Sequence, residues 1–176
     1  MYHDGNITGP FQPIVYDMVS RNLIGLSRFM GYEGKYADEI DKMMENSDEL
    51  TLKMQSVTGE LAYGGRSNQC LHNEVMLANY CELRAALLNK KGDKEKAGLF
   101  KAAARKAAKE AVWWLSEQPM SHIKNHFDPD LQLRCEGYAY FNKYMITVAS
   151  AIYSAYMISD ETIELTRVGI ASLYKY

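Results

Sequence analysis

The sequence has few cysteines and no motif that would place it in a disulfide-rich or zinc-binding class. Its 176 residues include three cysteines, an odd number, with no Cys-x-x-Cys pair. This excludes a disulfide framework and a zinc knuckle. Cys70 and Cys81 are too far apart along a helix to reach one metal ion together, so we expect free, buried thiols.

The sequence also lacks a large excess of positive or negative charge. The formal net charge is −2, so nothing indicates a general nucleic-acid-binding surface. Lysines and arginines gather over residues 90–109, but acidic residues are interspersed among them, as on a solvated helix face. We therefore expect no nucleic-acid partner.

Residues 144–159 carry no charge, yet this run is shorter than the ~20 residues needed to cross a bilayer. We predict a buried helix there and no membrane partner. The first residues lack a basic segment followed by an apolar one, so no signal peptide is predicted in this chain.

The sequence does contain apolar residues at helical spacing, and few of its segments have the pattern typical of strands. A hydrophobic content of 47% is enough for the core of a single all-α domain covering residues 1–176. The spacing of apolar residues predicts helices over residues 15–30, 35–54, 71–88, 94–117, 139–159 and 161–174. Residues 45–49 are polar, so the second of these helices is expected to bend or break there.

The expected helices differ in how much of their surface is apolar. The helix over 94–117 is amphipathic, with Trp114 facing inward, Lys101, Arg105 and Lys109 facing solvent, and Asp93 as its N-cap. The helices over 71–88 and 139–159 are apolar on most faces and are expected to be enclosed by neighbours. This alternation predicts antiparallel helical hairpins in two layers.

Two polar loops stand out between these helices, at residues 56–74 and 118–138. Gly59, Gly64 and Gly65 allow close backbone approach in the first loop. Polar side chains then follow within a few positions, namely Arg66, Asn68, Gln69, His72, Asn73 and Glu74. Tyr63, Tyr138 and Tyr140 lie in or beside the loops and are candidates for contacting a ligand.

Simpler interpretations of these residues stay open. Glu74 is favoured at a helix start by the helix dipole, and Asn68 is a possible cap. Arg66 is an alternative ion-pair partner for Glu60 or Glu74. His122 and His126 have the spacing of a helical metal chelate, but no third ligand is near them, so we expect neither a metal site nor a cofactor.

Several short segments resemble one known group of proteins. They are Tyr-Asp at 16–17, Gly-Tyr-Glu-Gly-Lys-Tyr at 31–36, Gln-Ser-Val-Thr-Gly-Glu at 55–60, Gly-Gly-Arg-Ser-Asn-Gln at 64–69, His-Asn-Glu at 72–74 and Glu-Gly-Tyr-Ala-Tyr-Phe at 136–141. Together they resemble the (α/α)-toroid domains of bacterial carbohydrate-active enzymes, in particular the heparinase- and alginate-lyase-like polysaccharide lyases and related toroid glycoside hydrolases. The resemblance implies a partial toroid of about six helices, completed by a second chain or a further half, and a periplasmic or secreted protein.

The resemblance also implies an acidic glycan as substrate, cleaved by β-elimination. That reaction needs groups that neutralise a uronate carboxylate, a base and an acid. Arg66, Asn68, Gln69 and Asn73 are candidates for the carboxylate, His72 or His126 for the base, and Tyr138 or Tyr140 for the base or the acid.

Two alternatives remain at this point. A hydrolase would instead pair Glu74 with Asp128, Asp130 or Glu136. We favour the lyase because His, Asn, Arg and Tyr outnumber plausible paired carboxylates. The other alternative is a non-catalytic helical binding module or an inactive fragment.

Overall fold

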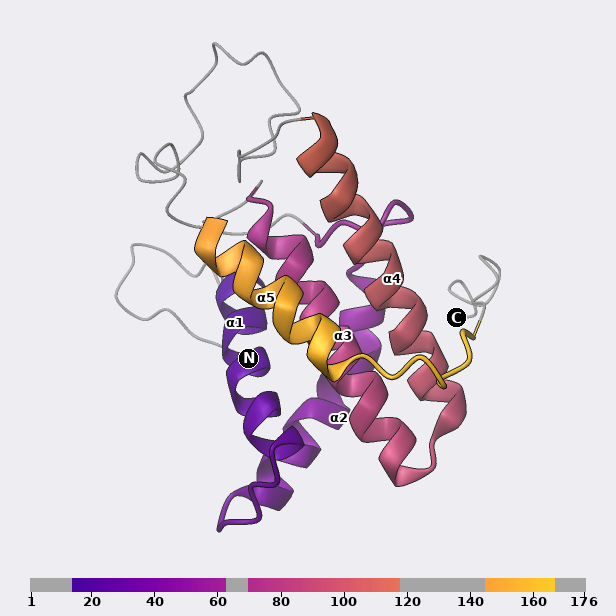
Figure 1. Cartoon of the computed structure of the whole chain (residues 1–176). Coiled ribbons are helices and arrows are strands. Elements are labelled where there is room, and N and C mark those ends of the chain that lie inside the picture. Colours follow the sequence, from indigo (N-terminus) through magenta and orange to yellow (C-terminus); the bar gives the residue numbers. More distant parts are fainter. Residues whose placement is uncertain (1–13, 63–69, 118–144, 167–176) are drawn as a thin grey trace.

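The regular elements of the described chain are all helices. The computed structural model describes residues 14–62, 70–117 and 145–166. Five helices pack together in these ranges, which contain no strand (Figure 1). They are α1 (Ile14–Phe29), α2 (Ala37–Lys53), α3 (His72–Lys91), α4 (Lys94–Glu117) and α5 (Met145–Ile158). The all-α prediction is therefore confirmed.

The connection between α3 and α4 is made by two residues with opposite roles. Gly92 adopts φ 88°, the left-handed conformation that commonly ends a helix. Its N–H donates to the carbonyls of Leu88 and Asn89, which α3 itself leaves unpaired. The Asp93 carboxylate then accepts the N–H of Lys96 at 3.1 Å and caps α4, as predicted. Because the turn is so short, α4 returns antiparallel to α3.

Contacts along the helices show that α1 and α3 run in the same direction. Asn79 of α3 donates through its side-chain amide to the Asn22 side chain of α1, 2.9 Å away. Further along both helices, Gly25 lies so close to Leu83 that an added Cβ would come within 2.3 Å of the leucine side chain. Glycine at position 25 therefore permits the close packing of these two helices.

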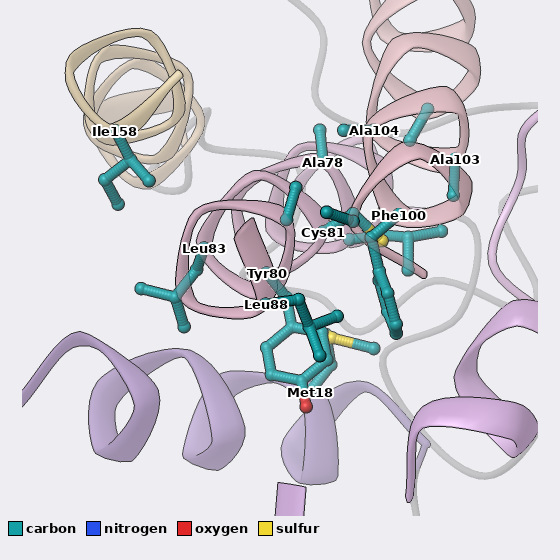
Figure 2. Close-up of a cluster of buried hydrophobic side chains, with 14 of the residues drawn as sticks. Met18, Ala78, Tyr80, Cys81, Leu83, Leu88, Phe100, Ala103, Ala104 and Ile158 are labelled. Atoms are coloured by element: carbon teal, nitrogen blue, oxygen red, sulfur yellow. The ribbon is translucent and has the colours of Figure 1, made fainter. Parts of the chain in front are cut away.

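The helix α3 lies in the middle of the bundle, between α1 and α4, and α5 crosses in front of it (Figure 1). Its side chains meet those of three neighbours in one apolar cluster (Figure 2). Met18 comes from α1, Tyr80 and Leu83 from α3, Phe100 from α4 and Ile158 from α5. The prediction that this helix is enclosed by its neighbours is confirmed.

Buried charge on α3 corrects the prediction that Lys101 faces solvent. Lys101 is 1% exposed, and its ammonium group lies 2.8 Å from the Glu82 carboxylate of α3 and 2.6 Å from the Ser159 hydroxyl. Arg105 and Lys109 are exposed as expected. Lys101 is spaced along α4 like these two exposed residues, but its ammonium group pairs with the buried Glu82 carboxylate on the facing helix. The sequence pattern of α4 alone does not reveal this partner.

A second buried ion pair explains why α2 does not break at residues 45–49. The Arg84 guanidinium of α3 binds the Asp48 carboxylate with two hydrogen bonds, of 2.8 and 2.6 Å. Asp48 is fully buried, and α2 is continuous from Ala37 to Lys53. The expected break was wrong because one of the polar residues that suggested it faces the interior and is neutralised there.

The exposed face of α5 corrects the prediction of a wholly buried helix. Val148, Ala151 and Ile158 are buried, but large apolar side chains on the other face are exposed, among them Ile146 at 78% and Tyr156 at 75%. The absence of charge in this helix therefore does not reflect enclosure on all sides by the described residues. No helix in the described ranges is long and apolar enough to span a membrane.

The helix expected to begin at residue 161 is not formed over residues 161–166, and residues 167–174 lie outside the described ranges. Asp160 instead closes a turn, because its carboxylate accepts the N–H and the hydroxyl of Thr162. Ile163 is buried in the main core, and the Thr166 hydroxyl donates to the carbonyl of Glu95 on α4 at 3.1 Å. These contacts hold the segment against the start of α4, and they replace helical hydrogen bonding.

Candidate functional site

Three of the predicted site residues form the first turn of α3. His72, Asn73 and Glu74 are consecutive, and all three are buried, with exposed fractions of 6%, 5% and 1%. A buried imidazole, amide and carboxylate in one helical turn require hydrogen-bonding partners, because these groups lose their contacts with water. The prediction that these residues lie together at a helix start holds.

Glu74 has a structural task that the sequence did not reveal. Its carboxylate accepts the backbone N–H of Leu61 at 3.2 Å. Leu61 closes a tight turn, in which Gln55 and Leu61 form an isolated antiparallel bridge and Ser56 donates its N–H to the carbonyl of Glu60. Glu74 therefore fixes the turn at residues 55–61 against the start of α3. A charge-assisted bond to a backbone N–H is among the stronger hydrogen bonds.

The same turn is also held against α4. Gly59 has φ 120°, and a Cβ at this position would come within 2.4 Å of the Lys106 carbonyl oxygen. The Gln55 side-chain amide donates to the carbonyl of Ala103 at 2.8 Å. Glycine is therefore needed at position 59 both for its backbone angle and for the close approach to α4.

Three helix ends meet around the first turn of α3. Leu71 and Val75 pack with Ala111 and Trp114 near the end of α4 and with two residues near the start of α5, Val148 and Ala151. Trp114 is buried as predicted, and its indole N–H donates to Glu110 at 2.9 Å. The described helix ends that flank residues 63–69 and 118–144 thus lie at one end of the bundle (Figure 1).

The remaining predicted site residues belong to those two segments and lie outside the described residues. The structure therefore leaves their position relative to His72 as a prediction. They are Tyr63, Arg66, Asn68, Gln69, His126, Tyr138 and Tyr140. The possible second carboxylates of a hydrolase, Asp128, Asp130 and Glu136, lie in the same undescribed range, as do both histidines of the possible chelate.

In the described ranges the structure supports neither a reactive Cys81 thiol nor a group of side chains that could hold a metal ion. Cys81 is a free, fully buried thiol, as predicted, and burial raises its pKa far above the usual range, which keeps it protonated. Within residues 14–62, 70–117 and 145–166, no group of three His, Cys, Asp or Glu side chains is placed to hold a metal ion.

Comparisons of the chain with protein-family models, with curated proteins and with solved structures found no match. The function must therefore be argued from the residues themselves.

Proposed function

We propose that this chain is part of an (α/α)-toroid domain of a carbohydrate-active enzyme that cleaves a uronate-containing polysaccharide by β-elimination. The architecture is compatible with this, because α1 and α3 run in one direction and α4 runs against them, as successive hairpins of a two-layered toroid would. The short motifs noted above, including Tyr-Asp at 16–17 and His-Asn-Glu at 72–74, support the same class.

The observation that carries the proposal is the first turn of α3. It places a buried imidazole, amide and carboxylate at the end of the bundle where α4 ends and α5 begins. The two polar segments that hold the other required residue types are joined to the chain at this same end. Functional side chains are commonly carried by loops on a rigid scaffold, and α3 is the most enclosed part of this one.

The proposed reaction breaks a carbon–hydrogen bond and a carbon–oxygen bond and forms one carbon–carbon double bond. A base removes the proton on the carbon next to the uronate carboxylate, and the electron pair forms a carbon–carbon double bond. The bond from the neighbouring carbon to the glycosidic oxygen breaks, and an acid protonates that oxygen as it leaves. Positive or amide groups beside the carboxylate stabilise the charge that develops on it.

In this proposal His72 or His126 is the base, and Tyr138 or Tyr140 is the base or the acid. Asn73, with Arg66, Asn68 and Gln69, binds the uronate carboxylate. The base and the acid are then both His or Tyr side chains. Proton transfer by a positioned side chain of this kind typically raises the rate 10²–10⁴-fold.

The role of Glu74 favours elimination over hydrolysis. A glycoside hydrolase needs two carboxyl groups that face the scissile bond. The Glu74 carboxylate accepts the N–H of Leu61 at 3.2 Å, so in this proposal it holds the turn at residues 55–61 against the start of α3. We therefore treat Glu74 as a positioning residue for a lyase, and the hydrolase that uses it as an acid or a nucleophile is the alternative.

The assay that tests this proposal separates the two reactions by their products. The chain is incubated with a panel of uronate polymers while the ultraviolet absorbance of the unsaturated product and the number of new reducing ends are followed. A lyase raises both together. New reducing ends without the absorbance would refute elimination and support hydrolysis.

A non-catalytic helical module is a second candidate, favoured by the outer face of α5. This helix has no charged residue, and Ile146, Tyr153 and Met157 on its surface are each more than half exposed. Exposed apolar patches often mark protein–protein contacts. For such a module, none of the uronate polymers would yield either product.

A further inference from the structure

The outer side of the α1–α2 hairpin contains a cleft that none of the arguments above has used. Its volume is about 660 Å³. This lies within the range of roughly 300–1,000 Å³ that is typical of small-molecule sites. Asp17, Ser20 and Arg21 line it from α1, and Lys42, Asn46 and Ser47 line it from α2.

A buried arginine, Arg21, is among the residues that line the cleft. Arg21 is 8% exposed, and its guanidinium donates to the Thr51 hydroxyl at 2.7 Å and forms an ion pair with Asp17. The guanidinium also lies 6.0 Å from the centre of the Tyr80 ring. These contacts restrain the planar group, and the guanidinium has further N–H groups that can act as donors.

The charges around the cleft cancel. Asp17 and Glu39 are the acidic residues that line it, and Arg21 and Lys42 are the basic ones. An anionic ligand would meet two carboxylates, and a cationic ligand would meet two cations. The electrostatics therefore favour a neutral ligand.

The other lining groups suit a molecule that is polar at its edges and apolar on its faces. Ser20, Asn46 and Ser47 supply hydroxyl and amide groups, and the Ser47 hydroxyl donates to the Met44 carbonyl at 2.8 Å. Three apolar side chains lie beside them, Ile24, Met43 and Leu50. Sugar rings have this combination of hydroxyl edges and C–H faces.

We propose that this cleft binds a neutral, polyhydroxylated ligand of about one or two sugar rings. The Arg21–Asp17 pair provides a donor and an acceptor side by side for neighbouring hydroxyl groups, and the apolar side chains contact the ring face. The inference goes beyond the proposed lyase activity and does not rest on it, because none of the cleft residues belongs to the first turn of α3.

The test is a titration of the purified chain, followed by NMR of its backbone amides. The probes are glucose, galactose, mannose and N-acetylglucosamine, with glucuronate as a charged comparison. We expect at least one neutral sugar to shift amide signals within residues 17–24 and 39–50. We also expect glucuronate to bind more weakly than that sugar.

Two matched variants show whether the cleft is the binding site. Asn46 and Glu49 are both exposed on α2, but only Asn46 lines the cleft. Asn46→Trp should fill the cleft and weaken binding by on the order of tenfold or more, whereas Glu49→Trp should leave it unchanged. Neither substitution touches the buried core, so both variants should fold.

The proposal is overturned if none of the neutral sugars binds, if only glucuronate binds, if the shifts lie elsewhere, or if the two variants weaken binding equally. Failure here is distinguishable from failure of the lyase assay. A chain that binds a neutral sugar in this cleft but yields no unsaturated product would leave this inference standing and refute the proposed activity.

Discussion

Arg84 and its carboxylate partner show how single residues tie α3 to its neighbours. Burial alone lowers the pKa of Arg84, but the hydrogen bonds and charge of Asp48 outweigh it, so the pKa is raised and the group stays charged. Both side chains are almost fully buried. Lys96 adds a third charge, with its ammonium group 3.1 Å from the Asp48 carboxylate.

Removing one partner of this buried pair should be far more damaging than removing both. Asp48→Ala leaves the Arg84 charge buried without its carboxylate and should lower the free energy of unfolding by about 3–5 kcal/mol. The double variant Asp48→Leu with Arg84→Met should lose much less. Lys53→Ala, which breaks the exposed pair with Glu49, is the control and should cost under about 1 kcal/mol. Urea denaturation measures all three, and equal losses for Asp48→Ala and Lys53→Ala would contradict the account.

Asp41 gives a pH-dependent prediction. Its carboxylate binds the Arg28 guanidinium at 2.9 and 3.1 Å, and this hydrogen bonding, with help from Lys91, holds the pKa of Asp41 below its usual 3.8 despite partial burial. A carboxyl group whose pKa is lowered by folding stabilises the protein above its unfolded pKa, and this contribution is lost as the pH falls through the native pKa.

The stability difference between the wild type and Asp41→Asn should therefore be constant near neutral pH and shrink below pH 3.8. Urea midpoints at about pH 7 and about pH 3 measure it, with an expected difference of up to about 1 kcal/mol at the higher pH. Glu39→Gln, at an exposed position on the same helix, is the control. A difference that grows as the pH falls would show that the sign is wrong.

Among the secondary-structure elements, the turn at residues 55–61 contributes most to the candidate site. It is held from two sides, by Glu74 at the start of α3 and by the Ala103 and Lys106 carbonyl region of α4. Since residues 63–69 begin two positions after this turn, its position fixes the described end of the chain that precedes them.

Gly59→Ala should destabilise the protein more than Gly31→Ala does. Both glycines have positive φ, 120° and 94°, so both variants carry a backbone penalty of roughly 1–2 kcal/mol. Only at position 59 would the added Cβ meet backbone atoms, whereas at position 31 nothing lies within 4 Å. We expect an additional loss of about 1–3 kcal/mol for Gly59→Ala, measured by thermal or urea unfolding. Equal losses would show that the turn is not pressed against α4.

The helices themselves were largely predictable from local patterns, and their surroundings were not. The helix over 94–117 has the predicted bounds, because its N-cap Asp93 and its amphipathic period are encoded in neighbouring residues. The continuity of α2 depends on Arg84, 36 positions from Asp48, and the burial of Lys101 depends on Glu82. Such partners on another helix leave no trace in the local pattern.

The candidate site was predictable to the extent that it lies in one turn. His72, Asn73 and Glu74 are adjacent in sequence, so a helix start brings them together without any information about the fold. The hydrogen bond that the Leu61 N–H donates to Glu74 joins groups 13 positions apart, and no spacing rule anticipates it. The α1–α2 cleft was missed for the same reason, since it exists only once two helices are packed.

At the scale of the whole molecule, the helix α3 has both a structural role and a candidate functional role. The helix α3 is tied to α1 through Asn79, to α2 through Arg84 and to α4 through Glu82, while its first turn presents the candidate catalytic residues. A scaffold fixed on three sides holds a site more accurately than a loop does alone. We propose that His72, or alternatively His126, is the base of the elimination, and that Glu74 holds the turn at residues 55–61 against the start of α3.

The most direct test is the rate of absorbance increase on a cleaved uronate polymer for the wild type, His72→Ala and Glu74→Gln, with circular dichroism confirming that each variant folds. We predict that His72→Ala loses on the order of 10²-fold or more. Glu74→Gln should keep most of the activity, because an amide oxygen can still accept the N–H of Leu61. Full activity in His72→Ala, or complete loss of activity in a folded Glu74→Gln, would contradict the account.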